Sequence, residues 1–252
     1  MRINGFLFLL LAVSFLNSCS SMDKNADTPE GAFAIAESFE KDERYEIAIQ
    51  RYQEIKNKYP YSQFAMKSEL AIADVYFKQE SYAEAQVSYQ SFRDLHPKHP
   101  QIDYIIFRIA LSYYHQVPEA IDRDLSLAHD AITYFKEIEE KYSGKGSGAG
   151  TKSQYAKEAE DKHLELLKKL AGKEEYIGDF YMKRKVWDSA LARFEGLLKR
   201  YQKLGFDEKA LSKAAICAYE FGDAQKAHKL LAELEKNYPG SAEISQAKKV
   251  VR

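Results

Sequence analysis

The chain has 252 residues, of which 45% are hydrophobic, so it can bury one large core or two smaller ones. Its 37 basic and 38 acidic side chains nearly cancel, which removes the strong positive field that a non-specific DNA- or RNA-binding protein needs. Only two cysteines are present, Cys19 and Cys217, which excludes a disulfide framework and a four-cysteine zinc site.

The first eighteen residues have the pattern of a secretory signal. Arg2 provides a basic start, and an apolar run of eleven residues follows at 6–16. At about 1.5 Å per helical residue, this run is too short to cross a hydrocarbon core of about 30 Å. We therefore expect residues 1–18 to be removed as a signal peptide.

The signal ends in Leu-Asn-Ser-Cys at 16–19, which resembles the lipobox of bacterial lipoproteins. The resemblance implies that Cys19 becomes the first mature residue and carries several acyl chains, enough to hold a protein stably at a membrane. It also implies an outer-membrane address, because Ser20 rather than an aspartate follows the cysteine. An ordinary cleaved signal, with Cys19 as a spectator, is the alternative. The small, polar segment 19–28 is expected to be a flexible tether.

One residue spacing recurs five times in the rest of the chain. Tyr45, Ala48, Tyr52 and Tyr59 fall within roughly 60° of one another on a helix, so they share one buried face. An alanine holds the second position and a large side chain the third in every occurrence, as close helix packing requires. The other four occurrences lie at 82–96, 128–142, 187–201 and 224–238.

Prolines follow the second helix of several of these units. Pro60, Pro97 and Pro239 each come after the last periodic residue, where proline ends a helix. No convincing period-two strand pattern is present. The spacing resembles the tetratricopeptide repeat, and it predicts an all-α fold of five helix pairs in a right-handed α-solenoid, with repeats 1–3 at 29–142 and repeats 4–5 at 155–252. A generic amphipathic helical bundle is the alternative.

Two insertions interrupt the repeat. The first, at 115–124, is expected to be a loop between the two helices of the third unit. The second is a glycine-rich loop at 143–154, which lacks the Gly-Lys-Ser/Thr triplet and the preceding strand of a phosphate-binding loop. A long helix is expected from Tyr155 to Leu170, and its continuation through Gly172 to Tyr181 is left open.

The residues that often carry chemistry have structural explanations here. His96 and His99 have the spacing of metal ligands, but His96 stands where other repeats place a tyrosine, which favours a packing role. Cys217 lies in an apolar helical stretch and is expected to be a buried, unreactive thiol. No nucleophile with a visible base and no zinc-protease or serine-hydrolase motif is found. We therefore expect neither catalysis nor a cofactor or metal.

A longer segment goes beyond the generic repeat. Leu-His-Pro-Lys-His-Pro-Gln-Ile-Asp-Tyr-Ile-Ile-Phe at 95–107, with Tyr-Pro-Tyr-Ser-Gln-Phe at 59–64, Asp-Arg-Asp at 122–124 and Arg-Phe-Glu-Gly at 193–196, resembles the BamD/YfiO family of outer-membrane β-barrel assembly lipoproteins. The resemblance covers essentially the whole mature chain. The glycine-rich insertion after Tyr142 departs from the family pattern.

The resemblance implies a periplasmic scaffold that is lipid-anchored to the outer membrane. Such proteins bind POTRA domains of the barrel-forming (BamA-like) subunit through their C-terminal half, work with other assembly lipoproteins, and receive signals of unfolded outer-membrane proteins in their N-terminal repeats. The candidate POTRA-facing residues are Phe180, Tyr181, Arg193 and Glu195, with Arg123 and Asp124. The candidate signal-pocket residues are Tyr61, Phe64, Asp103 and Tyr104.

Each candidate has a simpler alternative. Arg193 and Glu195 are explained as a solvated surface pair, Arg123 and Asp124 as residues that pin their own loop, and Asp103 as a helix cap. At the level of function, one rival is an envelope repeat protein associated with peptidoglycan or the Tol system. Another is an envelope enzyme that uses the repeats as a platform, for which the sequence nominates no residue.

Overall fold

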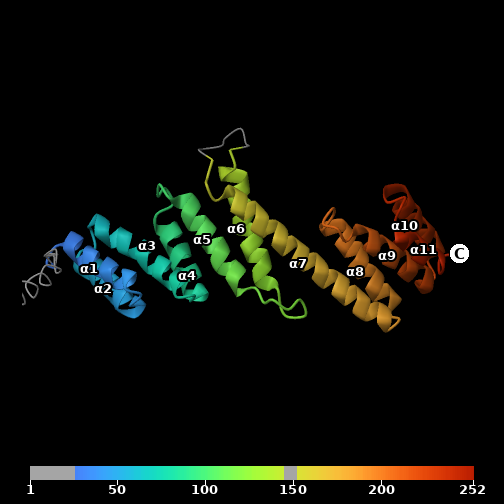
Figure 1. Ribbon diagram of the computed structural model, residues 1–252, viewed down its shortest axis with the longest axis horizontal. Helices are drawn as coiled ribbons and strands as arrows, with labels where there is room; N and C mark the ends of the chain where they lie inside the picture. Colours follow the sequence, from blue (N-terminus) through green and yellow to red (C-terminus); the bar gives the residue numbers. More distant parts are fainter. Residues whose placement is uncertain (1–25, 145–151) are drawn as a thin grey trace, which may run out of the picture. The chain divides into compact units, whose positions relative to one another are not determined.

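The computed structural model describes residues 26–144 and 152–252, and all regular structure within them is helical (Figure 1). The predicted signal peptide, Cys19, most of the tether and most of the glycine-rich loop lie outside these ranges. The chain divides into two compact units, one ending at Ser88 and one running from Tyr89 to Arg252. Each unit is described by itself. Within the described ranges, no helix combines the length and the apolar character needed to cross a bilayer.

Unit 1 consists of three complete helices and the start of a fourth. Thr28 and Ser62 begin two of these helices by accepting hydrogen bonds from the backbone amides of Gly31 and Ala65, at 3.1 and 3.2 Å. Pro60 lies in the turn between the second and third helices, as predicted. The helices are α1 (Pro29–Lys41), α2 (Tyr45–Lys58), α3 (Gln63–Lys78) and α4 (Tyr82–Leu95), the last of which continues into unit 2.

The core of unit 1 forms where α2 packs against both α1 and α3. Ala48 and Tyr52 of α2 are completely buried there. The Tyr52 hydroxyl donates to Glu40 of α1 at 2.6 Å, and Glu40 also accepts from Lys78 of α3 at 2.5 Å. Burial and the Glu40 carboxylate raise the pKa of Tyr52 far above its ordinary value, so the phenol stays a neutral donor. The three helices are thus joined by one polar network at the edge of the core.

Unit 2 is a succession of helices in which each one after α4 packs against the next, apart from the last. The short helix α11 contacts both α9 and α10. The helices are α5 (Ile102–Gln116), α6 (Ser126–Tyr142), α7 (Ala156–Lys183), α8 (Trp187–Arg200), α9 (Asp207–Phe221), α10 (Ala224–Asn237) and α11 (Ala242–Lys248). The first insertion connects α5 and α6 as predicted, except that His115 and Gln116, which were assigned to the loop, form the end of α5.

The long helix α7 runs without interruption through Gly172, which resolves the continuation left open by the sequence (Figure 1). It packs against α6 on one side and α8 on the other. Near its end, Gly178 lets the buried ring of Phe194 approach the α7 backbone, since a Cβ atom at Gly178 would lie only 2.7 Å from that ring. α7 thereby connects the third repeat to the fourth.

The repeat prediction is confirmed. The alanines at the second position are fully buried in all five occurrences, and the side chains at the third position are at most 8% exposed. These residues are Ala48, Ala85, Ala131, Ala190 and Ala227, followed by Tyr52, Tyr89, Phe135, Phe194 and Leu231. The chain is therefore an all-α protein of five helix pairs, α1/α2 to α9/α10, completed by α11. The right-handed superhelix of the whole chain stays a prediction.

Candidate binding surfaces

Arg193 and Glu195 lie on α8, and each forms an ion pair with a different neighbouring helix. The Arg193 guanidinium is 3.4 Å from Glu174 of α7, and the Glu195 carboxylate is 3.1 Å from Lys226 of α10. The alternative in which the two residues pair with each other is therefore wrong. Both side chains remain 42% exposed, so they connect three helices at the surface and also remain accessible to a partner.

Phe180 and Tyr181, at the end of α7, differ in how much of their surface is available. Phe180 is 42% exposed, and the guanidinium of Arg184 lies 3.7 Å above its ring. Tyr181 meets the Phe180 ring edge-on at 5.6 Å and packs against the core of the C-terminal helices. Phe180 therefore offers an exposed aromatic face, whereas Tyr181 mainly supports it.

Arg123 and Asp124 lie in the loop before α6, where both hold the loop in place. Asp124 accepts hydrogen bonds from the backbone amide of Ser126 at 3.0 Å and from its hydroxyl at 2.9 Å, and these bonds lower the pKa of the Asp124 carboxyl. The backbone carbonyl of Arg123 accepts from Lys173 of α7. These contacts favour the loop-pinning interpretation for Asp124, while the exposed Arg123 side chain remains a candidate contact.

The N-terminal candidates of unit 1 are Tyr61 and Phe64. Tyr61 is fully exposed in the turn between α2 and α3. Phe64 packs its ring 5.6 Å from that of Phe33 on α1, and the Lys67 ammonium lies 4.9 Å from the Phe64 ring centre. Tyr61 therefore has no packing role within unit 1, whereas Phe64 packs at the edge of the core.

The other two pocket candidates, Asp103 and Tyr104, are at the start of α5 in unit 2. The residue that precedes the helix is Gln101, so the interpretation of Asp103 as the helix cap is wrong. Asp103 instead occupies the first turn, where a negative charge is stabilised by the helix dipole. The Tyr104 ring lies 5.7 Å from that of Tyr155 and 5.6 Å from the Arg108 guanidinium. A pocket shared by all four candidates stays a prediction.

A partly buried charge cluster between α7 and α9 was not anticipated from the sequence. Lys213 lies 2.9 Å from Glu175 and 2.7 Å from Asp179, with its side chain 22% exposed. Burial lowers the pKa of Lys213, but hydrogen bonds to the two carboxylates outweigh burial and raise it overall. The i, i+4 spacing of Glu175 and Asp179 was the available signal, but only the fold supplies their common partner.

The residues with potential reactivity are packed. Cys217, one turn after Lys213, is fully buried, and burial raises the pKa of its thiol to about 12. The rings of His96 and His99 both lie against Phe92, at 4.6 and 5.2 Å between ring centres. Within residues 26–144 and 152–252, no three His, Cys, Asp or Glu side chains gather as metal ligands would. The expectation that Cys217 and His96 serve packing is confirmed.

Comparison with known proteins gives a consistent result along the chain. Residues 25–220 match the model of the YfiO family, described as outer membrane lipoproteins, and residues 209–241 match a tetratricopeptide repeat model. The outer membrane protein assembly factor BamD of Neisseria meningitidis serogroup A is 26% identical over 95% of this chain and 94% of its own length. That of Rickettsia prowazekii is 28% identical over 83% of this chain and 80% of its own.

Solved tetratricopeptide structures are also similar to this chain. The TPR2AB-domain:pHSP90 complex of yeast Sti1 covers 88% of this chain, and 84% of its own chain is covered, with 14% identity and a TM-score of 0.42.

Proposed function

Because this chain belongs to the YfiO family of outer membrane lipoproteins, we propose that it is a non-enzymatic scaffold in the assembly of outer-membrane β-barrel proteins. The observation that carries this proposal is the family match over residues 25–220, together with relatives named outer membrane protein assembly factor that align along nearly their full length. The helical repeats supply extended surfaces for other polypeptides, and no step of this function needs a cofactor or a nucleic acid.

Cys19 would carry the anchor in the periplasmic leaflet of the outer membrane. The lipobox-like ending of the signal supports this location, and so does the description of the family as lipoproteins. A lipid anchor concentrates the repeats at the membrane where barrels are inserted, which raises the effective concentration of both partner and substrate. Mass spectrometry of the mature N-terminus tests the anchor directly.

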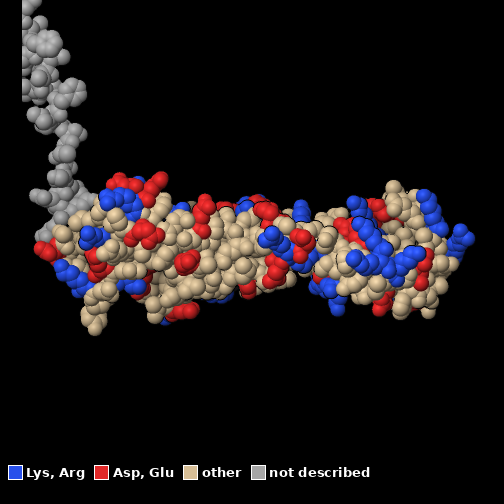
Figure 2. All heavy atoms as spheres, turned by 90° about the horizontal axis from the view of Figure 1, so that it is seen from below, with Lys and Arg blue, Asp and Glu red and all other residues tan. Residues whose placement is uncertain are grey.

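The C-terminal helices would bind the POTRA domains of the barrel-forming (BamA-like) subunit. The near-zero net charge conceals an asymmetry: residues 181–252 contain 15 basic and 9 acidic side chains, whereas residues 26–180 contain 20 basic and 28 acidic ones. Lys and Arg side chains gather over the C-terminal helices in Figure 2. Exposed lysines there include Lys199, Lys229 and Lys236, which form no ion pair with described residues. This surface fits an acidic partner.

Phe180 is the proposed central contact of that surface, since it combines an exposed aromatic face with the adjacent Arg184 cation. Replacement F180A should weaken binding of purified POTRA domains by at least about tenfold, as expected for an aromatic hot spot. L164A is the matched control, because Leu164 lies on the same helix with 41% exposure. Equal binding by both variants would remove Phe180 from the interface.

The N-terminal repeats would receive the signal of an unfolded barrel protein. Tyr61 offers a fully exposed ring in unit 1, and Tyr104 offers a partly exposed ring beside Arg108 in unit 2. Aromatic contacts and backbone hydrogen bonds would hold an extended strand without a covalent step. Site-specific photocrosslinkers at Tyr61 and Tyr104 should capture nascent outer-membrane proteins, and a crosslinker at Phe221, exposed in the C-terminal part, should not.

A crosslinked pull-down from native membranes tests the proposed function as a whole. Recovery of a POTRA-bearing barrel protein and other assembly lipoproteins supports the scaffold. The rival is a peptidoglycan- or Tol-associated repeat protein, for which the purified chain would bind cell-wall sacculi and the pull-down would contain no barrel subunit. That combination of results would replace the proposal with the rival.

A further inference from the structure

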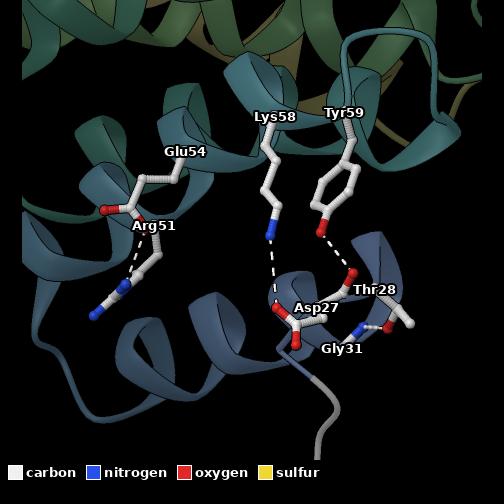
Figure 3. Close-up of polar contacts among 7 residues, drawn as sticks. All are labelled: Asp27, Thr28, Gly31, Arg51, Glu54, Lys58 and Tyr59. Atoms are coloured by element: carbon white, nitrogen blue, oxygen red, sulfur yellow. Dashed lines mark hydrogen bonds and ion pairs between the residues drawn. The ribbon is translucent and has the colours of Figure 1, made fainter.

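The point where the chain enters unit 1 is held by the end of α2 (Figure 3). The Tyr59 hydroxyl donates to the backbone carbonyl of Asp27 at 2.7 Å, and the Lys58 ammonium lies 3.7 Å from the Asp27 carboxylate. The next residue, Thr28, caps α1 through the amide of Gly31. Asp27 and Tyr59 are 32 residues apart in the sequence, so this contact is a tertiary one.

The Tyr59 hydroxyl is not needed by the repeat itself. The position filled by Tyr59 is filled by His96 in the second repeat, which has no hydroxyl. Tyr201 and Tyr238 occupy it in the fourth and fifth repeats, and their hydroxyls make no hydrogen bond to described residues. The repeat therefore requires a ring at this position, and the hydrogen bond to Asp27 is an additional role of the tyrosine in the first repeat, Tyr59.

Beside this contact lies a groove of about 210 Å³ between α1 and α2. Its floor is apolar, and the Arg51–Glu54 ion pair, 2.9 Å long, lies on one wall. Ala26 lines the groove as well, so the chain enters unit 1 along a formed surface. The neighbouring Tyr59 and Asp27 raise the pKa of Lys58 above its ordinary value.

We propose that Lys58 and Tyr59 are positioning residues that fix where the membrane tether leaves unit 1. This inference rests on the proposed lipid anchor at Cys19. Eight residues lead from Cys19 to Asp27, and at about 3.6 Å per extended residue they span at most about 29 Å. With Asp27 held, the edge of unit 1 where α1 begins and α2 ends faces the bilayer within that distance.

Hydrogen exchange on the full lipidated chain in detergent micelles tests the contact. In Y59F, the amides of Gly31 and Ala32, which bond to Thr28, should exchange about 2- to 10-fold faster, as expected for one lost hydrogen bond. The double variant K58M/Y59F should exchange faster still. Y238F is the matched control and should leave these amides unchanged. Unchanged exchange in the double variant, or the same increase in Y238F, overturns the proposal.

Fluorescence quenching in liposomes tests the direction. A label at N57C, on the last turn of α2, should be quenched by headgroup-attached quenchers at least twofold more than a label at E43C, before α2 begins. Y59F should reduce this difference. Cys217 is buried, so the label is expected to react only at the introduced cysteine. Equal quenching at the two sites in a lipidated protein overturns the proposal, whereas absence of lipid at Cys19 by mass spectrometry removes the proposed anchor and leaves the exchange result standing.

Discussion

Two glycines of α7 should respond in opposite directions to the same substitution. Alanine is favoured over glycine in a helix interior by about 0.5–1 kcal/mol. At Gly172 a new Cβ atom would meet only the Phe206 ring at 3.9 Å, an ordinary contact. At Gly178 it would lie 2.7 Å from two atoms of the Phe194 ring, which is fully buried and therefore has no open space to move into. Overpacking of this kind typically costs about 1–3 kcal/mol.

The net expectation is that G172A stabilises the protein by about 0.5–1 kcal/mol, and that G178A destabilises it by about 0–2.5 kcal/mol once the gain in helix propensity is subtracted. Because both variants share the gain in helix propensity, their stabilities should differ by the overpacking cost of about 1–3 kcal/mol, which at roughly 2–4 °C per kcal/mol is a difference in melting temperature of about 2–12 °C. Thermal unfolding followed by circular dichroism at 222 nm measures the difference. Equal stabilisation by both variants would show that the Phe194 ring is not held against the α7 backbone.

Four further outcomes follow from the contacts of unit 2. Cys217 should not react with a thiol reagent at pH 8 in the folded protein and should react fully in urea, because its thiol is buried and its pKa is raised to about 12. K213A should lower stability by about 1–3 kcal/mol in urea titration, since Glu175 and Asp179 lose their common partner in a partly buried site, and K213R should retain most of it. R193A should cost less than about 1 kcal/mol by the same titration, since the Arg193–Glu174 pair is solvent-screened. The hydrogen bond from Tyr114 lowers the pKa of Glu165 below its ordinary 4.5. The Glu165 carboxylate should therefore contribute to stability above pH 4.5, and this contribution should disappear as the pH falls through the folded-state pKa. NMR titration should show that the pKa of Glu165 is lowered less in Y114F.

The helical architecture could be predicted from the sequence because the same spacing of an alanine and a large side chain occurs in each of the five repeats. The small side chain of an alanine such as Ala190 lets a neighbouring helix approach closely. A ring such as Phe194 then fills the space beside it, so both residues are buried. Each repeat restates this requirement, so five weak signals give one strong prediction. Gly172 was ambiguous for the opposite reason: a single glycine costs about 1 kcal/mol in a helix, and only tertiary packing on both sides of α7 decides that the helix continues.

The polar contacts were not predictable in the same way. A periodic pattern shows which side of a helix is exposed, but it does not show which opposite charge lies across from it. Arg193 and Glu195 are two residues apart and were considered as a pair, yet residues at that spacing point to different sides of a helix. They reach Glu174 and Lys226 on separate helices. The candidate residues were found by resemblance, and their partners only by the fold.

Some of the C-terminal candidate residues already contact neighbouring helices of unit 2, and this affects how much each could contribute to binding a partner. Arg193, Glu195 and Tyr181 each already hold neighbouring elements of unit 2 together. A partner that contacts Arg193 must therefore either share its charge with Glu174 or displace that carboxylate, and displacement would offset much of the gain from the new pair. Phe180 is already in contact with the Arg184 guanidinium, but 42% of its surface is exposed, so a partner can contact the ring without breaking an ion pair. Binding energy at this surface should accordingly concentrate on the aromatic side chain, with the charged residues setting the orientation and the salt dependence of association.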